Sequence, residues 1–536
     1  MEALTRSGVP HPPPPSGGDL PPEQDRFVWR TSEVASMVLY FAVLGAGILA
    51  LPEDLMSTLT AHGVFGGLGA LGTWRFAWWF THFVRAQLYT RVVYAKLRAD
   101  GVALWERGWR PDEVAFMMTT FKEDPATTRA VLDSIVAELA RIGVAGRLVI
   151  GSGDASDERV ITEHLSTIHA PVRLDVVFVR QTQPGKRVAI GLALRAMSRI
   201  GVHGDTPVVF LDGDSLMAPG CLERCLPLFE LEPKMDALTT LERAIVRGPI
   251  LMQKWLDLRF AQRHLTMNSH ALSRKVLTLT GRLSVYRARA VLDEEFISTV
   301  EEDHLDDWLW GRFRFLSGDD KSTWYCLLKR GAEMRYVPDA LVYTIERLDG
   351  ALFDRVVQNL LRWSGNMLRN GRRALHLGPA RVGPFIWWCI LDQRIAMWSC
   401  LAGPIAILGG ALLIHPALLL TFPLWVMFTR GVQSCLLFVY HRRIDVTFPF
   451  VLYFNQIAAS VVKIYILFRL PIQRWANRGD QRANDALGPG WRWKRAMASY
   501  LTALWVTLFV VGVLLLTGAF DEGARFHLVA FLDLLL

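Results

Sequence analysis

The order of apolar and polar residues divides this chain into membrane-like and soluble parts. Uninterrupted apolar stretches approach the roughly 20 residues that a helix needs to cross a bilayer, and they occupy residues 34–51, 62–83, 395–414, 416–440 and 499–518. Charged residues concentrate in the long segment between the second and third of these stretches. The pattern predicts membrane helices on both sides of a soluble domain.

A sixth apolar stretch, residues 447–468, contains Asn455, Gln456 and Lys463. If it crossed the membrane, the basic segment after it would lie on the side opposite to the other basic loops, against the positive-inside rule. We therefore predict that residues 447–468 lie at the membrane interface or re-enter, which leaves five true spans.

Within the soluble segment, short β-rich apolar runs alternate with helical patterns. The run EVAFMMTTF is followed by the loop KEDPATT and the helical pattern TTRAVLDSIVAELARIG. The runs RLVIGSGDASDE, LDVVFVRQTQPGKR and TPVVFLDGDSLMAPG each repeat a strand that ends in a loop rich in Gly, Asp or Lys. This alternation predicts an α/β fold with a Rossmann-like, mostly parallel sheet that binds ligands at the carboxyl ends of its strands.

Composition supports a membrane protein and removes some alternatives. Hydrophobic residues make up 51% of the 536 residues, with 19 Trp, which is high for a soluble enzyme. The net charge of +8 would suit nucleic acid, but basic residues cluster beside the apolar spans, as in VRAQLYTRVVYAKLR, so no nucleic-acid partner is expected. The six cysteines form no CxxC pair and have no His at zinc-ligand spacing, so we expect reduced core or lipid-facing thiols.

Residues 1–30 form an N-terminal segment with the run PPPP followed by SGG. It has almost no apolar residues to bury, which predicts a disordered tail. It also lacks the basic region joined to an apolar core that marks a signal peptide, so the first span is expected to remain as an anchor.

Two aspartates follow the apolar strand VVFL in the sequence VVFLDGDS. Asp212 and Asp214 are separated by one glycine, so both carboxylates can reach the crevice at the end of the strand. Hard oxygen ligands on a tight loop suit Mg²⁺ or Mn²⁺, which would in turn hold a diphosphate. A solvated turn is the alternative, because DxD is common.

A second pair, Asp319 and Asp320, stands in GDDKSTW ahead of a helical run. One of these aspartates could cap the helix, since carboxylates are favoured at that position. A carboxylate near a metal-bound diphosphate could also remove a proton from an attacking sugar hydroxyl. Both roles can hold, with Asp319 capping and Asp320 catalysing.

The motifs EDPATT, GKR, DGDS, GRLSVYRARAVL, GDD and RW occur in an order that resembles the processive family-2 glycosyltransferases, which include cellulose, chitin and hyaluronan synthases. GDDKSTW and RWSGNMLRN are most similar to the alginate-polymerising members of that family. The resemblance covers roughly residues 30–500. It implies a GT-A type domain at residues 91–380, two transmembrane helices at 31–90, and C-terminal transmembrane and interface helices at 381–536 that form a polymer channel.

The resemblance also implies roles for individual residues. Asp320 takes the position of the general base that acts on the acceptor hydroxyl, with Asp319 before it, and Asp212 and Asp214 take the metal and substrate positions. Thr119 and Glu123 match the family's positions at the nucleotide base, and Lys186 matches a position near the diphosphate. Asp154 or Asp157 matches the substrate-binding aspartate that follows the second strand.

The family's QxxRW motif reads NLLRW here, with Asn359 where Gln is expected and Gln358 beside it. Arg362 and Trp363 remain, and they match residues that stabilise the leaving group and stack on the acceptor. The alternative for this pair is an ordinary basic and aromatic pair at a membrane interface.

The implied activity is polymerisation of GDP-mannuronate into β-1,4-linked polymannuronate, with inversion and export. The implied partners are a polyuronate acceptor, the lipid bilayer, and regulatory and periplasmic export subunits. The implied location is the bacterial inner membrane, with a multi-pass chain and a cytoplasmic catalytic domain. The alternatives are another processive synthase, of cellulose, chitin or hyaluronan, or a non-enzymatic transporter or receptor that binds nucleotide.

Positive charges also stand inside the apolar stretches, namely Arg75, Arg394, Arg430 and Lys463. Such residues cost several kcal/mol in hydrocarbon and normally face a partner or an aqueous path. One alternative has Arg394 extending to the interface and the other three paired with Asp or Glu. Because the stretches contain almost no acids, we expect instead that Arg75 and Arg430 line a cationic export channel for polyuronate.

Overall fold

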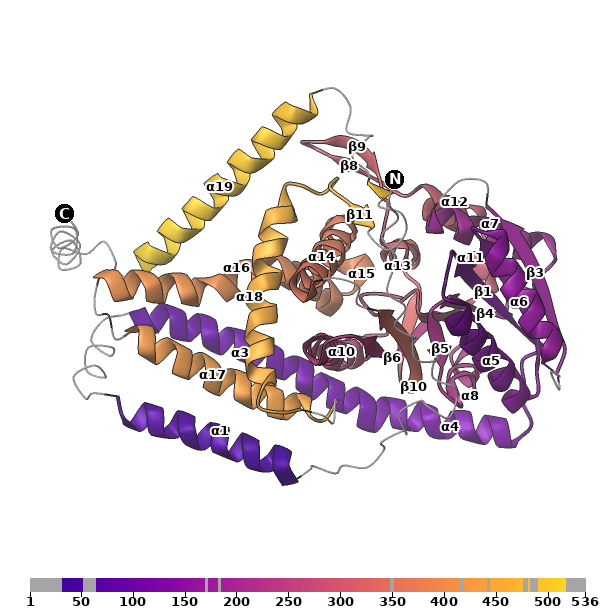
Figure 1. The fold of residues 1–536 in the computed structure, drawn as a ribbon, viewed down its shortest axis with the longest axis horizontal. Helices are drawn as coiled ribbons and strands as arrows, with labels where there is room; N and C mark the ends of the chain where they lie inside the picture. The colour runs from indigo at the N-terminus through magenta and orange to yellow at the C-terminus, as the bar shows by residue number, and fades with distance from the viewer. Residues whose placement is uncertain are drawn as a thin grey trace, which may run out of the picture.

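A computed structural model describes most of the chain, namely residues 31–51, 64–168, 172–181, 185–347, 351–413, 416, 418–440, 444–475, 481–482 and 490–516. The predicted tail at residues 1–30 lies outside the described residues. Figure 1 shows an elongated molecule, with an α/β body at one end and a group of long helices at the other.

An eight-stranded sheet forms the centre of the body, in the order β3-β2-β1-β4-β7-β6-β10-β5. Its strands are β1 (Glu113–Thr120), β2 (Ala145–Ser152), β3 (Leu174–Arg180), β4 (Pro207–Asp212), β5 (Ser215–Met217), β6 (Met235–Arg247), β7 (Leu283–Arg287) and β10 (Glu333–Arg347). The first four strands of the order pair in parallel. β7 is antiparallel to β4 and β6, and β5 is antiparallel to β10, so the predicted α/β sheet is confirmed with a mixed second half.

The helices that follow the parallel strands pack against the sheet. They are α5 (Pro125–Ile142), α6 (Ala155–Thr167) and α7 (Lys186–Arg199). α5 begins where the Asp124 side chain accepts a hydrogen bond from the amide of Thr127, and it ends at Gly143, whose φ of 66° is left-handed. The Asp124 cap fixes where the loop after β1 stops, and that loop borders the site described below.

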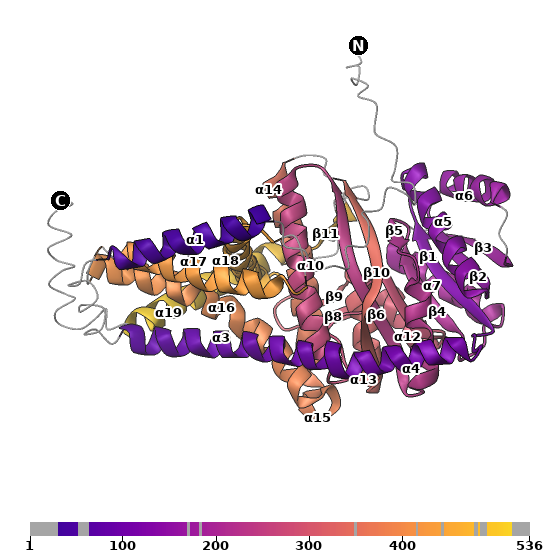
Figure 2. The ribbon, with the colours of Figure 1, turned by 90° about the horizontal axis from the view of Figure 1, so that it is seen from below.

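One unbroken helical run joins the membrane-like end to the body. It consists of α3 (Val64–Leu88), the π-helical segment η1 (Tyr89–Tyr94) and α4 (Ala95–Glu106), and Figures 1 and 2 show it running along the molecule. Within η1, the Tyr89 hydroxyl donates to the Tyr336 carbonyl at 2.6 Å, and the Tyr94 hydroxyl donates to Asp339. The boundary expected at residues 90 and 91 therefore falls inside a helix that is anchored to β10.

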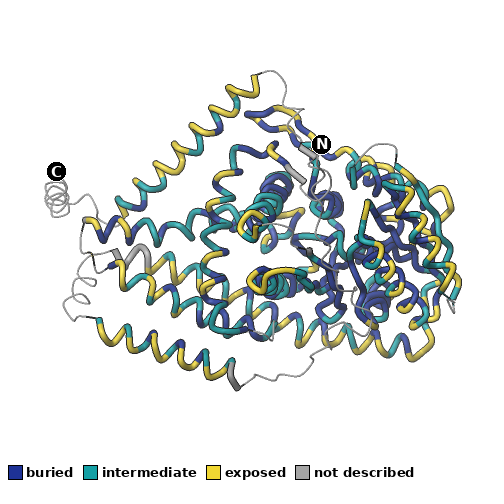
Figure 3. The backbone as a smooth tube through the Cα atoms, viewed as in Figure 1, coloured by how far each residue is buried: buried dark blue, intermediate teal, exposed yellow. Residues whose placement is uncertain are grey.

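The helices at the far end carry apolar side chains on their outer surface. α1 (Thr31–Leu49) and α19 (Trp491–Leu516) are largely exposed along their length (Figure 3). Among the described residues, three helices are long and apolar enough to cross a membrane, namely α16 (Pro384–Leu413), α18 (Phe448–Leu467) and α19. α1, α3 and α17 (Leu418–Leu437), which were predicted as spans, form helices but fall outside this group of three, and the apolar part of α1 is shorter than theirs. The three helices associate the protein with a membrane.

α18 differs in direction from its neighbours. It lies across α16, α17 and α3 in Figure 1, whereas those three run along the molecule. It contacts α16 and α17 and also α14 (Leu352–His376), which belongs to the body. This orientation fits a helix at the membrane interface, although the length of α18 would also allow a crossing. The expected count of five spans therefore stays a prediction.

The expectation that Arg75 lacks an acidic partner is wrong. Its guanidinium lies 2.5 Å from the Asp392 carboxylate of α16, and the Trp78 indole donates to the same carboxylate at 3.0 Å. Arg430 instead donates to the Gln456 side chain at 2.7 Å. Arg75 thus joins α3 to α16 as half of an ion pair and is not a free cation on a channel wall.

Candidate active site

A cavity of about 940 Å³ opens at the carboxyl ends of β1 and β4. Its wall combines the loop after β1, the DGDS and GDD loops, α10 (Ile250–Ala271) and α14. Asp212, Asp214 and Asp320 all line it. The carboxylates that the sequence predicted for metal binding and for proton removal therefore meet in one crevice, as a glycosyl transfer site requires and a simple nucleotide-binding module does not.

Lys186 connects the two pairs of aspartates. Its ammonium lies 2.7 Å from the Asp212 carboxylate and 2.9 Å from that of Asp319. Gly281 closes over this group, because a β-carbon there would lie 3.2 Å from the Lys186 nitrogen and 3.3 Å from Asp212 Oδ2. Lys186 thus holds the DGDS loop against the GDD loop and brings a positive charge to the place expected for a diphosphate.

Asp212 and Asp214 form a strongly anionic pair. Burial raises the pKa of Asp214, and the charge of Asp212 raises it further. Two carboxylates that repel each other in a buried site are stabilised by a divalent cation, and oxygen donors at the end of a strand suit Mg²⁺ or Mn²⁺. The residues present therefore fit the metal that the sequence analysis expects at Asp212 and Asp214.

The GDD loop differs from the expected capping arrangement. α13 (Asp319–Arg330) already includes both aspartates, and Gly318 occupies the N-cap position with a φ of 86° and no side-chain cap from the described residues. The predicted capping role is wrong for both aspartates. Asp319 instead pairs with Lys186, and Asp320 Oδ2 accepts a hydrogen bond from the Thr278 hydroxyl at 3.3 Å.

The two neighbouring carboxyl groups differ in acidity. Burial opposes ionisation of Asp319, but the charges of Lys186 and Arg187 outweigh it and lower its pKa. Burial raises the pKa of Asp320, and the nearby charge of Asp319 adds to that rise. The ion-paired Asp319 is thus suited to a positioning role, and the more basic Asp320 is suited to accept a proton. Asp320 is therefore the candidate base.

The GDD loop rests on α14 through a close contact. Gly318 lies against Asn366, and a β-carbon at Gly318 would approach Asn366 side-chain atoms to 2.6 Å, besides meeting a positive φ. The Ser317 hydroxyl donates to Asn366 Oδ1 at 3.1 Å. The RWSGN sequence of α14 and the GDD loop therefore form one packed unit, which explains why a glycine precedes the two aspartates.

In α14, the residue of the NLLRW motif that faces the cavity differs from the one expected. Gln358 and Arg362, four residues apart on one helix face, both line the cavity, whereas Asn359 is buried and 4% exposed. Gln358 is thus the amide that faces the site, although Asn359 matches the motif by position. Trp363 also lines the cavity and stacks on Trp255 of α10, with ring centroids 5.7 Å apart.

The residues expected near the nucleotide base lie in different places. Glu123 lines the cavity, but Thr119 is buried in β1 and is 1% exposed. Asp154 caps α6 by accepting from the Ser156 amide at 2.9 Å, away from the cavity lining. Asp157 accepts from the Lys122 amide at 2.7 Å, so it supports the loop that carries Glu123. Of the two second-strand candidates, Asp157 is the one linked to the site.

Sequence reasoning missed a further group of charged residues that line the cavity. Glu242 of β6 pairs with Arg263 of α10 and, at 3.1 Å, with Arg282, which also pairs with Glu346 at 3.1 Å. All four line the cavity, together with Arg259. The available signal was an acidic residue inside a β-rich strand run, as in LTTLERAIV, because a charge buried there needs a partner.

Comparisons with known proteins agree with this geometry. Residues 111–366 match the family described as "Glycosyltransferase like family 2". The chain is 37% identical over 461 residues to a protein named "Glycosyltransferase alg8" from Pseudomonas syringae pv. tomato, covering 86% of this chain and 93% of that one. It is 36% identical over 497 residues to a protein of the same name from Azotobacter vinelandii, covering 92% of this chain and 100% of that one.

Among solved structures, a mannosyltransferase from Pyrobaculum calidifontis, solved with GDP-Man and Mn²⁺, aligns with a TM-score of 0.40 and 17% identity, over 72% of this chain and 98% of that one. The family match spans the cavity-lining loops from the DGDS aspartates to Asn366, and the two relatives extend the similarity over most of the chain. The chain therefore belongs to the family-2 glycosyltransferases, in the group that includes the alg8 glycosyltransferases.

Proposed function

We propose that this glycosyltransferase polymerises GDP-mannuronate into β-1,4-linked polymannuronate for alginate synthesis. The observation that carries the proposal is the convergence of Asp212, Asp214 and Asp320 on one cavity, with Lys186 bridging Asp212 and Asp319. The similarity to alg8 glycosyltransferases supports the choice of product.

The reaction follows from the positions of these groups. Asp320 removes the proton from the 4-hydroxyl of the growing chain, and that oxygen forms a bond to the anomeric carbon of the donor while the bond to the diphosphate oxygen breaks. Attack from the face opposite to the leaving group inverts the α-linked donor to a β-linked product, and GDP leaves. Lys186 and Arg362 lie at the cavity and offset negative charge on the departing diphosphate. A Mg²⁺ or Mn²⁺ ion at Asp212 and Asp214 would neutralise that charge further.

The choice of an acidic sugar is supported by Arg259. Its guanidinium lies 4.5 Å from the centroid of the Trp363 ring and donates to the Asn455 side chain at 3.1 Å. It lines the cavity, and among the described residues it forms no ion pair with a carboxylate, in contrast to Arg263 and Arg282. Burial lowers its pKa to about 10, so it stays charged at neutral pH.

A cation held beside an aromatic platform is suited to a sugar ring that carries a carboxylate. The ring would stack on Trp363 while its carboxylate meets Arg259. A neutral glucan would leave this partly buried charge without a counter-ion, which is unfavourable. This arrangement supports a polyuronate acceptor in preference to cellulose or chitin.

The location we propose is the bacterial inner membrane, with the body at residues 91–380 in the cytoplasm and the helices of residues 31–90 and 381–536 in or on the bilayer. The C-terminal helices would form the path by which the polymer leaves, with Arg430 as the remaining cation on that path. Regulatory and periplasmic export subunits complete the expected partners.

The donor is tested with membranes that contain the full chain and labelled GDP-mannuronate, GDP-mannose, UDP-glucose or UDP-N-acetylglucosamine. Polymer is expected from GDP-mannuronate alone, it should stop when EDTA removes divalent cations, and a mannuronate-specific lyase should degrade it. Polymer from a UDP-sugar would identify another synthase. Binding of nucleotide without consumption of any donor would favour the transporter or receptor.

The role of Arg259 is tested by Arg259→Gln. Loss of a charge-assisted contact costs about 1.5–3 kcal/mol, so kcat/KM for chain extension is expected to fall roughly 10- to 100-fold, with shorter polymer. Arg259→Lys should restore part of the rate, because it keeps the charge. Arg274→Gln is the matched control, since that arginine pairs with Glu333 at the surface. Unchanged chain length and rate in Arg259→Gln would contradict the assignment.

A further inference from the structure

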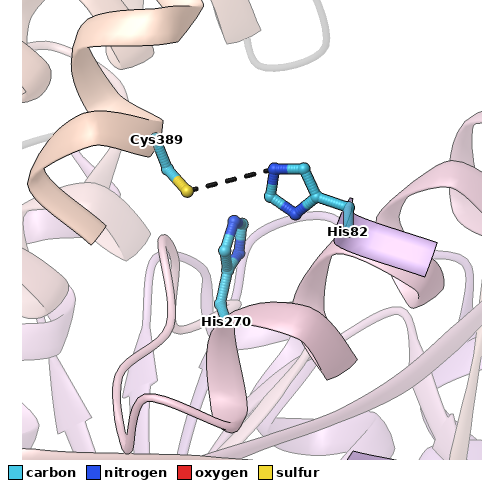
Figure 4. A group of neighbouring side chains, drawn as sticks. All are labelled: His82, His270 and Cys389. Carbon is cyan, nitrogen blue, oxygen red and sulfur yellow. Dashed lines mark hydrogen bonds between the residues drawn. The ribbon is translucent and has the colours of Figure 1, made fainter. Parts of the chain in front are cut away.

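Three metal-ligating side chains meet outside the cavity, where the long helices join the body. They are His82 of α3, His270 of α10 and Cys389 of α16, and Figure 4 shows them facing one another from three separate helices. One ligand atom from each lies within 4.8 Å of the other two. All three residues are buried, with exposed fractions of 8%, 4% and 4%. None of them lines the active-site cavity.

The ring positions favour a ligand between the three side chains. The Ser269 hydroxyl lies 2.9 Å from Nδ1 of His82, which leaves Nε2 directed at the Cys389 sulfur, 4.0 Å away. A ring nitrogen of His270 faces the gap between the other two side chains (Figure 4). Nδ1 of His270 is buried and has no hydrogen-bond partner within the described part of the chain. Such an unsatisfied buried nitrogen is uncommon and calls for a missing partner.

We propose that His82, His270 and Cys389 bind a Zn²⁺ ion, with water in the fourth position. Two imidazoles and a thiolate are preferred zinc ligands, whereas Mg²⁺ and Mn²⁺ prefer oxygen. Zinc ligands at about 2.0–2.3 Å from the ion lie about 3.5 Å apart in a tetrahedron, so side-chain shifts of about 1 Å would close the site. The Ser269 hydroxyl supplies the outer hydrogen bond that commonly orients a zinc-bound histidine.

The surrounding charges are compatible with such an ion. Asp392 follows Cys389 by one turn of α16, and it is held by Arg75 and Trp78. The guanidinium of Arg85 donates to the Ser269 carbonyl and the Ser273 hydroxyl, and it lies over the Phe385 ring. The Cys389 thiolate would thus provide a negative charge beside the ion, while the charge of Asp392 is offset by Arg75.

The consequence of the ion would be mechanical. α3 and α16 belong to the membrane-like end, whereas α10 carries Arg259 and Arg263 at the wall of the cavity. Zinc would fasten the C-terminal end of α10 to both of the other helices. It is distinct from the catalytic metal, because it would lie outside the cavity and be held by nitrogen and sulfur instead of carboxylates.

The proposal is tested on full-length protein in detergent, purified without a histidine tag and analysed for metals by mass spectrometry. About one zinc per chain is expected in the wild type and in Asp214→Asn, which removes a ligand of the catalytic metal. Cys389→Ser, His82→Ala and His270→Ala should each lower the zinc content at least tenfold. Cys225→Ser and His264→Gln are matched controls, since Cys225 is buried, His264 is half-buried, and both lie outside the cluster.

A spectroscopic readout separates metal binding from a folding defect. Protein reconstituted with Co²⁺ should show a thiolate-to-metal charge-transfer band, which Cys389→Ser should lose while it elutes as a monodisperse peak and still binds GDP. Wild-type protein without zinc or a cobalt band after reconstitution would overturn the proposal. Equal zinc in Cys389→Ser would also overturn it, and copper in place of zinc would overturn the choice of metal.

Discussion

Replacement of Asp320 by asparagine is expected to reduce polymer synthesis by about 10²- to 10⁴-fold while GDP binding and membrane insertion stay close to wild type. Asparagine keeps the volume and can still accept from Thr278, but it cannot take the proton of the acceptor hydroxyl. The Lys186 bridge between Asp212 and Asp319 does not involve this side chain, so the donor site should survive. The measurement is single-turnover transfer from labelled donor, together with GDP binding.

Asp306→Asn provides the control for Asp320, because Asp306 is an exposed carboxylate of β8 (His304–Asp307) outside the cavity. The pH profile gives a second readout. Burial and Asp319 raise the pKa of Asp320, and a base must be deprotonated, so wild-type kcat should fall with decreasing pH at a higher pH than an ordinary carboxylate would give. Wild-type polymer yield from Asp320→Asn would refute the assignment of the base.

Asp214→Asn is expected to abolish activity and yet leave the protein as stable as the wild type or more so. The pKa of Asp214 is raised by burial and by Asp212, so its ionised form opposes folding at neutral pH, and asparagine removes that cost. The same substitution removes an expected metal ligand but leaves the Lys186 contact to Asp212 in place. We expect a loss of at least 10³-fold in kcat/KM and a much higher Mn²⁺ requirement.

Thermal unfolding and metal-dependent turnover measure the two halves of this prediction on the same samples. Asp205→Asn serves as the control, because Asp205 is an exposed carboxylate outside the cavity that pairs with Arg287 and Arg289. A variant that loses stability and activity together would point to a structural role for Asp214. Unchanged metal dependence would exclude it as a ligand.

Local signals predicted the parallel half of the sheet. These signals are apolar runs that end in DGDS or GKR, and a capped helix after EVAFMMTTF. Each signal depends on residues within about thirty positions of one another, and β1, β4 and α7 form where these runs lie. The contact between the DGDS and GDD loops depends on residues far apart in the chain. This contact was predicted through the family resemblance, because the resemblance implies a tertiary arrangement and hydrophobic periodicity does not.

Other features depend on side-chain direction, which a motif does not specify. Whether Gln358 or Asn359 faces the cavity is decided by the rotation of α14 against the GDD loop. Cys389 and His82 are 307 residues apart, so no spacing rule could join them. Asp392 was overlooked as the partner of Arg75 for the same reason. It lies near the start of a long apolar helix, 317 residues further along the chain than Arg75.

The unbroken run from α3 through η1 to α4 limits which length changes the chain can accept. It extends from Val64 to Glu106, about 65 Å at 1.5 Å per residue. One residue inserted before η1 would turn everything on its N-terminal side by about 100° relative to the body, because a helix makes a full turn in 3.6 residues. Arg75 and His82 would then point away from α16 and α10. Homologous chains should therefore differ in this region by substitution, and insertions or deletions should gather in the connections between helices.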